Sequence, residues 1–374
     1  MKILHIAPIT KNQTAGLSHS VKNLLEAQSR NGFEVAVIST QSSENFFTRK
    51  IMWFSISNKN YLQIIIKNQI KKIIYDFGKP DVIIFHDLYN LKQSILLIHA
   101  LFSKCKIFIT PRGAFSPVAL SRSYFKKKIY YYLLIKPFIK YINAFIALNK
   151  QEAKIIRQIT QKKTIIISNG INDNSKIYKK YKKNYIEKSD SKIINICFLG
   201  RYDIYIKGLD YLLEGFIDYQ NASAKNKIKL HLIGNHSKKN DFKSATFFNK
   251  IYPKLKIKEN LIIEGPYYNE NKWKRLTKMD ILILPSRTEG MPNTVLEAMS
   301  LAIPCCVTKE TNISEIIKKS YSGWVFKGNK ESVKILFDDI EKLPKKKFIK
   351  MGLNGLEYAS RNLTWDKVCI SNYE

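Results

Sequence analysis

The chain has 374 residues, enough for two domains of ordinary size, and 45% of them are hydrophobic, which excludes a disordered protein. Its formal net charge of +33 suggests a polyanionic partner such as nucleic acid, an anionic membrane or a nucleotide, although an AT-rich genome, which favours Lys, Ile, Asn and Tyr together, also accounts for such a charge. The five cysteines are odd in number and lack any CxxC spacing, which excludes a disulfide framework and a zinc site.

Targeting and membrane-spanning segments are not expected. The start of the chain, residues 1–8, is too short an apolar run for a signal peptide and lacks a small-residue cleavage site. No stretch approaches 18 uncharged apolar residues, so no transmembrane helix is predicted. We therefore expect a cytoplasmic protein, and peripheral binding to the inner face of the plasma membrane stays open.

Strands and helices alternate along the first half of the sequence. The first helix should begin near Ser18 as its N-cap and bury Val21, Leu24, Leu25 and Gln28. Strands are predicted at residues 2–8, 35–39, 81–86, 106–110, 144–148 and 164–167. This alternation predicts an α/β domain with a parallel, doubly wound sheet.

Three residues of this half are candidates for substrate binding. Gly16 follows the first strand, where a residue without a Cβ lets backbone approach a ligand; it is equally consistent with a plain turn glycine. His86 ends the third strand and Arg112 follows the fourth, so both should lie at one edge of the sheet. The planar fork of Arg112 suits phosphate, whereas a histidine at a strand end is more often structural.

Residues 121–142 combine six basic residues with many aromatic and aliphatic ones. Lys136-Pro137 interrupts the segment, which predicts two short helices. Such a segment either lies on an anionic membrane or forms a solvated face over a packed helix whose lysines extend their charged ends to water.

The second half repeats the alternation after a polar segment, residues 174–191, that we interpret as a linker or surface loop. A helix should begin at Trp273, and residues 348–373 should be helical. Arg201 follows the first strand of this half and Lys207 precedes its helix, the position where a phosphate would bind; alone, both would be ordinary surface charges. Strands are predicted at residues 192–199, 229–234, 261–264, 281–285, 303–308 and 323–326.

The sequence around residues 287–299 places a turn and a helix start directly after a buried strand. The N–H groups within residues 291–294 would favour an anion, and Pro292 suits the first helical position. Glu289 and Glu297 flank this site, and carboxylates accept hydrogen bonds from sugar or ribose hydroxyls. The alternative is a helix start with ordinary acidic residues. The predicted substrate contacts here are Gly290, Met291, Pro292, Asn293, Thr294 and Glu297.

The pattern Glu289-Gly290-x-Pro292-Asn293-x-x-x-Glu297-Ala298-Met299 resembles the paired-glutamate motif of retaining nucleotide-sugar glycosyltransferases of family 4, which have the GT-B fold. Further family segments recur in order at Gly16, Ser168–Asn172, Gly200-Arg201 and Lys207-Gly208. The resemblance implies that Glu289 lies at the donor sugar, Glu297 binds the ribose, and Arg201 and Lys207 bind the diphosphate. Glu289, Arg201 and Lys207 are thus the candidate catalytic residues. Arg112-Gly113 stands where many relatives carry His-Gly.

The implied architecture is two doubly wound Rossmann-like domains facing across a cleft. The acceptor domain would span residues 1–168, the nucleotide-sugar domain residues 169–355, and a C-terminal helix, residues 356–374, would pack back on the first domain. The sequence has no Asp-x-Asp motif, and two cations with a helix dipole can stabilise the leaving diphosphate, so we expect no metal and no cofactor.

The resemblance implies transfer of a hexosyl-type sugar, with retention, from a nucleoside-diphosphate sugar to a glycan or polyprenyl-diphosphate-linked acceptor, as in the synthesis of bacterial O-antigen, capsule or lipopolysaccharide. Residues 121–142 would then dock on an anionic membrane, and nucleic acid would not be a partner. Two alternatives stay open: a basic nucleic-acid-binding protein, although the sequence contains no RNA-binding or helix-turn-helix motif, and a GT-B-like sugar-nucleotide enzyme that is not a transferase.

Overall fold

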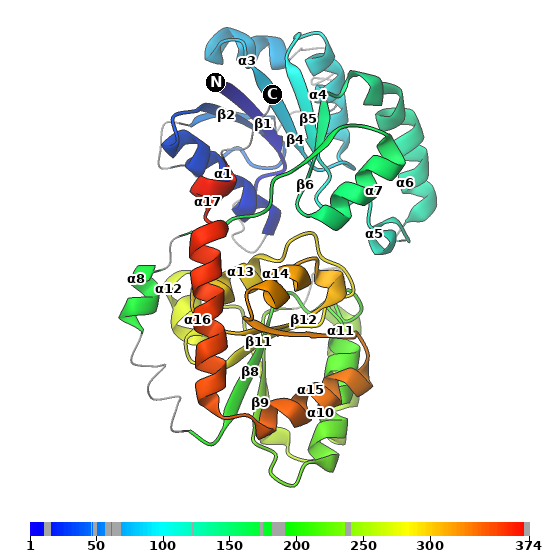
Figure 1. Cartoon of the computed structure of the whole chain (residues 1–374). Helices are drawn as coiled ribbons and strands as arrows, with labels where there is room; N and C mark the ends of the chain where they lie inside the picture. Colours follow the sequence, from blue (N-terminus) through cyan, green and yellow to red (C-terminus); the bar gives the residue numbers. More distant parts are fainter. Residues whose placement is uncertain are drawn as a thin grey trace. The chain divides into compact units, whose positions relative to one another are not determined.

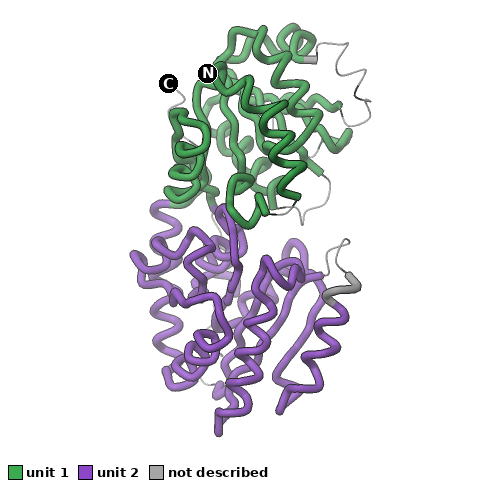
Figure 2. The backbone as a smooth tube through the Cα atoms, turned by 90° about the vertical axis from the view of Figure 1, so that its right-hand side faces the viewer, with its two compact units in different colours: residues 1–170, 363–374 green, residues 171–362 purple. Residues whose placement is uncertain are grey.

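The chain folds into two compact units. Figure 1 shows the computed structural model, and Figure 2 colours unit 1, residues 1–170 and 363–374, apart from unit 2, residues 171–362. The structure describes residues 1–10, 16–45, 47, 51–56, 61, 69–121, 123–172, 175–181, 191–235 and 241–369. Parts of segments discussed above lie outside these residues: Arg122, Asn174 and residues 182–190 of the predicted linker, and residues 370–374 at the C-terminal end.

Unit 1 is built on a seven-stranded sheet in which every neighbouring pair is parallel. The strands, in sheet order, are β3 (Met52–Ser55), β2 (Glu34–Ser39), β1 (Lys2–Ala7), β4 (Val82–His86), β5 (Lys106–Thr110), β6 (Ala144–Ala147) and β7 (Thr164–Ile166). The order runs in opposite directions from β1 and β4, so their carboxyl ends meet at the switch point of the sheet, where such folds bind ligands.

Helices cover both faces of this sheet, and the inner strands are buried on both sides, which agrees with their apolar sequences. The helices are α1 (Gly16–Arg30), α3 (Gln69–Phe77), α4 (Leu91–Leu101), α5 (Pro117–Ser121), α6 (Tyr124–Tyr130), α7 (Lys150–Thr160) and α17 (Trp365–Val368). A π-helical turn, η1 (Tyr131–Ile135), and a 3₁₀ helix, η2 (Lys136–Tyr141), extend α6.

Unit 2 carries a six-stranded, fully parallel sheet with the same kind of switch. Its strands, in sheet order, are β10 (Leu261–Glu264), β9 (Ile228–Ile233), β8 (Ile194–Leu199), β11 (Ile281–Leu284), β12 (Cys305–Thr308) and β13 (Gly323–Phe326). Here the switch point lies between β8 and β11. The two doubly wound α/β units confirm the predicted fold class.

Helical segments precede, connect and follow the strands of unit 2 along the chain. The α-helices are α8 (Ser175–Lys180), α10 (Leu209–Ala222), α11 (Asp241–Ile251), α12 (Asn269–Leu276), α13 (Asn293–Ser300), α14 (Ser314–Lys319), α15 (Lys330–Lys342) and α16 (Lys345–Asn362). Short 3₁₀ turns are η3 (Tyr252–Lys254), η4 (Lys258–Asn260) and η5 (Lys309–Thr311).

Several local predictions were wrong in their limits. Helix α1 begins at Gly16, so Ser18 lies inside it and does not cap it; its Oγ accepts from the Thr10 N–H at 3.1 Å. Trp273 lies in the second half of α12 and does not begin it, because the polar residues from Asn269 onward are already helical. Part of the predicted linker is helical as α8, and strand β3 was not predicted.

The predicted C-terminal helix is two helices, which belong to different units. Helix α16 runs to Asn362 in unit 2, where Gly352 packs so closely that a Cβ there would lie 1.9 Å from the carbonyl oxygen of Ala302. Helix α17 follows in unit 1, and its buried Trp365 packs against Leu24 of α1. In the part of the chain that the structure describes, no helix is both long and apolar enough to cross a membrane.

Candidate functional site

In unit 2, the loops after β8 and β11 bring Lys207 and Glu289 together. The Lys207 Nζ lies 2.5 Å from Glu289 Oε1, and the Ser286 hydroxyl donates to the same oxygen at 2.8 Å. The side chains of Lys207 and Glu289 are only 18% and 16% exposed. A cation and a carboxylate predicted to serve one substrate therefore face each other at the switch point of the sheet.

The loop that carries Lys207 packs tightly against the loop that carries Glu289. Gly208 has a left-handed φ of 64°, and a Cβ on it would lie 2.1 Å from the carbonyl oxygen of Pro285, so the two backbones touch where only glycine fits. Arg287 holds both carboxylate oxygens of Asp210 at 2.7 Å, and its guanidinium stacks on the rings of Tyr205 and Tyr211. Arg287 was not predicted; its signal, a cation directly before the motif, is weak in so basic a chain.

Glu289 is also held from the side of β12. The Thr308 hydroxyl donates to the carbonyl of Ser286 at 2.6 Å, and the Glu289 N–H donates to the carbonyl of Glu310 at 3.2 Å. The Asn312 side-chain amide donates to the carbonyl of Glu289. These bonds fix the backbone on which the carboxylate is presented.

The second glutamate of the motif lies on α13 and has its own lysine. Lys272 Nζ, from α12, lies 2.8 Å from Glu297 Oε1, and the two side chains are 20% and 13% exposed. Helix α13 begins at Asn293, one residue later than predicted, because Pro292 has the extended ψ of 114° and serves as the N-cap. Met291 is buried, and Gly290 and Thr294 are partly exposed.

Arg201 is placed differently from Lys207. It follows β8 by two residues and its side chain is exposed, with no hydrogen bond or ion pair to any other residue that the structure describes. The structure thus brings Lys207, Glu289 and the motif helix into one arrangement at the carboxyl edge of the sheet. Arg201 stays at the surface of that edge as an unengaged cation.

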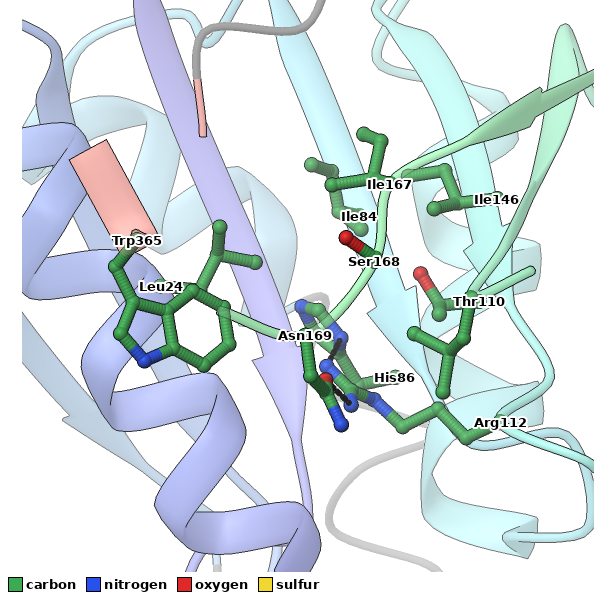
Figure 3. A pocket seen from close by; sticks show the side chains of 11 residues that line it. Leu24, Ile84, His86, Thr110, Arg112, Ile146, Ile167, Ser168, Asn169 and Trp365 are labelled. Carbon is green, nitrogen blue, oxygen red and sulfur yellow. Dashed lines mark hydrogen bonds between the residues drawn. The ribbon is translucent and has the colours of Figure 1, made fainter. Parts of the chain in front are cut away.

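In unit 1, the predicted His86 and Arg112 do come together, in the pocket drawn in Figure 3. Arg112 Nη2 lies 3.2 Å from His86 Nδ1, and His86 Nε2 lies 2.8 Å from Nδ1 of His5, whose Nε2 lies 2.8 Å from Gln28 Oε1. Because guanidinium only donates, His86 must accept from it and donate to His5, which donates to Gln28. This series of hydrogen bonds is complete when both imidazoles are neutral.

The electrostatics agree with neutral histidines. Burial, with the nearby Arg112 charge, holds the pKa of His86 well below its usual value, and burial lowers the pKa of His5 to about 3. Burial also lowers the pKa of Arg112 to about 10, so its guanidinium remains charged at neutral pH. His86 is therefore a buried orienting group for Arg112. His5 was not predicted, although it lies within the first predicted strand.

Arg112 has no hydrogen bond to a carboxylate in the described residues, although the charges of Glu152 and Asp87 oppose the lowering of its pKa. Its Nη1 donates to Asn169 Oδ1 at 3.4 Å, its Nε is enclosed without a hydrogen bond, and no ion pair joins it to an acidic residue in the described parts of the chain. Its φ of 52° and the φ of 115° at Asp87 are both left-handed, on neighbouring strand ends. Such backbone strain in residues with a side chain is typical of functional sites.

Asp87 was missed, although its position after the third predicted strand is the signal that selected His86. Burial raises the pKa of its carboxyl group, which accepts from the Leu88 N–H at 2.7 Å. Gly16, in contrast, is the first residue of α1 and is exposed, and the turn before it lies outside the described residues. No group of three or more potential metal ligands occurs in the described residues.

Comparison with known proteins identifies the family. The model for "Glycosyltransferase Family 4" matches residues 14–175, and the model for "Glycosyl transferases group 1" matches residues 177–354. The chain belongs to the family 4, group 1 glycosyltransferases. An uncharacterized 41.2 kDa protein of a cps region in Klebsiella pneumoniae is 25% identical to this glycosyltransferase, over 86% of this chain and 85% of that protein.

Two further comparisons agree. The capsular polysaccharide biosynthesis glycosyltransferase CapM of Staphylococcus aureus is 24% identical, over 78% of this chain and 82% of that one. The crystal structure of HepE from Anabaena, in complex with UDP and glucose, superposes with a TM-score of 0.73 at 14% identity, over 98% of this chain and 97% of that one. The GT-B assignment and the enzyme class are therefore confirmed, and the alternative of a nucleic-acid-binding protein is not supported.

Proposed function

We propose that this glycosyltransferase moves a hexosyl-type sugar, with retention, from a nucleoside-diphosphate sugar to a glycan or lipid-linked acceptor in bacterial cell-surface polysaccharide synthesis. The observation that carries the proposal is the pairing of Lys207 with Glu289 at the switch point of unit 2. Relatives named for a cps region and for capsular polysaccharide, and a fold shared with a protein bound to UDP and glucose, support this choice.

The diphosphate of the donor would bind to Lys207 and Arg201. Lys207 would exchange its carboxylate partner for phosphate oxygens, and the exposed Arg201 would close on the same group. Two cations and the N-terminal end of α13 would stabilise the charge that develops on the leaving nucleoside diphosphate. This arrangement supports transfer without a metal ion.

The two glutamates would then serve different hydroxyl groups. Glu289, beside Lys207, would accept from hydroxyls of the donor sugar, and Glu297 would accept from the ribose. The segment Gly290 to Thr294 would line the space between them. Departure of the diphosphate on the face that the acceptor attacks would leave the sugar with its original configuration.

The acceptor would bind at the carboxyl edge of the sheet in unit 1. Arg112, oriented by His86 and Asn169, is a partly buried cation that forms no ion pair with an acidic residue in the described part of the chain, so it suits an anionic group of the acceptor such as a phosphate. Gly16, at the start of α1, would let backbone approach the substrates without a side chain in the way.

A donor screen tests the proposal. The purified protein is incubated with UDP-, GDP- and dTDP-sugars, and nucleoside diphosphate release is measured by mass spectrometry with and without excess EDTA. We expect release from one class of donor, unchanged within about twofold by EDTA. Absence of release from every donor would contradict a transferase of this type, and an absolute Mg²⁺ requirement would contradict the metal-free mechanism.

A basic aromatic surface of unit 1 supports a lipid-linked acceptor. We define the 124–141 surface as the exposed side chains of α6, η1 and η2: the apolar ones include Phe125, Ile129 and Leu133, which are 78%, 60% and 67% exposed. Its exposed lysines are Lys126, Lys128, Lys136 and Lys140. The last three each lie over a tyrosine ring, 4.6–5.6 Å from its centre. Lys127 is not part of this surface, because its Nζ turns inward to the carbonyl of Ala119.

Such a surface would dock on an anionic membrane, because each lysine near the leaflet contributes about 1 kcal/mol and exposed aromatic residues insert shallowly. The protein should sediment with vesicles that contain anionic lipid, and salt should release it. Changing Lys126, Lys128 and Lys136 to Glu should abolish sedimentation. Changing Lys346, Lys347 and Lys350 of α16 to Glu alters the net charge equally and should not. Equal loss in both variants would mean that only total charge matters.

A further inference from the structure

Lys272, which lies outside the family motif, contacts Glu297, the second glutamate of that motif. Lys272 Nζ contacts Glu297 Oε1 at 2.8 Å, although the two residues come from different helices, α12 and α13. The other cations of α12 are engaged elsewhere or exposed: Arg275 holds Glu264, and Lys274 points to solvent. Lys272 is thus the α12 cation assigned to Glu297.

This pair differs from an ordinary surface salt bridge. Its side chains keep 20% and 13% of their exposure, and the Lys272 ammonium also lies 4.3 Å from the centre of the Trp273 ring. Enclosed ion pairs lose much of their attraction to desolvation, so they add little stability but fix geometry well. An enclosed pair with two directional contacts on its lysine therefore points to orientation.

The contact also leaves Glu297 with capacity for a ligand. Within the described residues, only Oε1 of Glu297 is engaged, and Oε2 has no hydrogen-bond partner. Glu289 shows the same arrangement, since Lys207 and Ser286 both contact its Oε1. Each motif glutamate is thus held by one oxygen and presents the other, and each has a cation that compensates its charge beside an anionic donor.

We propose that Lys272 is a positioning residue of the donor site, which fixes Glu297 so that its free oxygen accepts from a hydroxyl of the nucleotide ribose. This inference rests on the proposed function. Without Lys272, Glu297 would rotate freely and its uncompensated charge would repel the diphosphate. The effect should fall on donor binding, because the ribose contact is the same before and during the reaction.

The test measures binding and turnover of matched variants. For Lys272→Met, the Kd for UDP, or for GDP if the donor screen selects guanine, should rise about tenfold to a hundredfold, as for loss of a charged hydrogen bond. The KM for the donor should rise equally, and kcat at saturating donor should stay within about threefold. Lys272→Arg should recover most of the affinity, because Arg keeps the charge. Lys274→Met, on the same helix and exposed, should bind like the wild type.

A second measurement separates positioning from direct phosphate binding. The wild type should bind the 2′-deoxy and 3′-deoxy analogues of the same nucleoside diphosphate less tightly than the parent, and Lys272→Met should bind all three alike. If the variant loses affinity but keeps its preference for the intact ribose, Lys272 acts on the phosphates and the inference is overturned. Equal affinity of Lys272→Met and the wild type also overturns it. A wild type that binds no nucleoside diphosphate contradicts the proposed function itself.

Discussion

The two sheets have the same doubly wound topology, but the charged side chains at their carboxyl edges have different kinds of partner. In unit 2, each of three carboxylates has a cation from another element: Glu289 with Lys207, Glu297 with Lys272, and Asp210 with Arg287. In unit 1, two neutral histidines orient Arg112. No carboxylate of the described residues forms an ion pair with it, and Glu152 and Asp87 act on it only through their charge.

This difference indicates how each edge would receive a substrate. Where cations are already paired, an incoming anion must exchange partners with a carboxylate, and the released carboxylate becomes an acceptor for hydroxyls. Where the cation is held by neutral groups, an anion binds without exchange. The same fold thus offers one edge suited to a ligand with both phosphates and hydroxyls, and another suited to a simpler anion.

The largest effect should come from the cations of unit 2. Lys207→Ala and Arg201→Ala should each lower turnover by two to three orders of magnitude, about 3–4 kcal/mol of lost charge stabilisation. Circular dichroism should show an intact fold. Lys309→Ala, exposed after β12, is the matched control and should keep the wild-type rate. Near wild-type turnover in either variant would remove that residue from the diphosphate site.

The two glutamates should separate in steady-state kinetics, with effects of about tenfold to a hundredfold. Glu289→Gln should mainly lower kcat, because that group lies nearest the reacting sugar, and Glu297→Gln should mainly raise the donor KM. The Glu289→Gln substitution also frees Lys207 from its carboxylate partner. The variant should therefore bind a nucleoside diphosphate without a sugar at least as tightly as the wild type does. If both variants changed only KM and by the same factor, the two glutamates would not have different roles.

Changing Arg112 of unit 1 should affect transfer but not the donor reaction. Arg112→Gln should lower transfer to a membrane lipid extract about tenfold, as expected for one charged hydrogen bond. Hydrolysis of the donor in the absence of acceptor should change less than twofold. Arg157→Gln, an exposed arginine of α7, serves as the control. If donor hydrolysis fell as much as transfer, the two edges would not be specialised.

The neutral histidines should make unit 1 sensitive to acid. The pKa of His5 is about 3 in the fold and about 6.5 unfolded, so its stabilising contribution is complete above pH 6.5 and lost as the pH falls. Between pH 7 and 5 this costs about 2 kcal/mol of unfolding free energy. Urea unfolding of His5→Asn should show that much less dependence on pH than the wild type, and an equal dependence in both would contradict this prediction.

The sequence predicted the features that depend on local pattern. Apolar runs such as Ile281 to Leu284 identify buried parallel strands, and their alternation with helices leads to the two switch points. Motif residues were predictable because they follow those strands directly. Strand β3 was not predicted, because it is only four residues long and partly exposed.

The sequence did not predict which residues pair with one another within the site. Lys207 and Glu289 are 82 residues apart, and Lys272 is one of 63 basic residues with nothing in its neighbours to single it out. Which lysine meets which glutamate depends on how α12 and α13 pack, and that is a tertiary property. The chain from Arg112 through His86 and His5 likewise joins three strand regions that no local pattern connects.

Gly208 has a consequence for how the sequence of this enzyme can vary. Its missing side chain leaves the space into which the carbonyl of Pro285 fits, so every substitution would push the Lys207 loop away from Glu289. A saturation library selected for activity should therefore retain only glycine at this position, as strictly as it retains any charged residue. Randomised neighbours on the exposed side, such as Tyr205, should tolerate more exchanges. A residue without a functional group would then rank among the least replaceable in the protein.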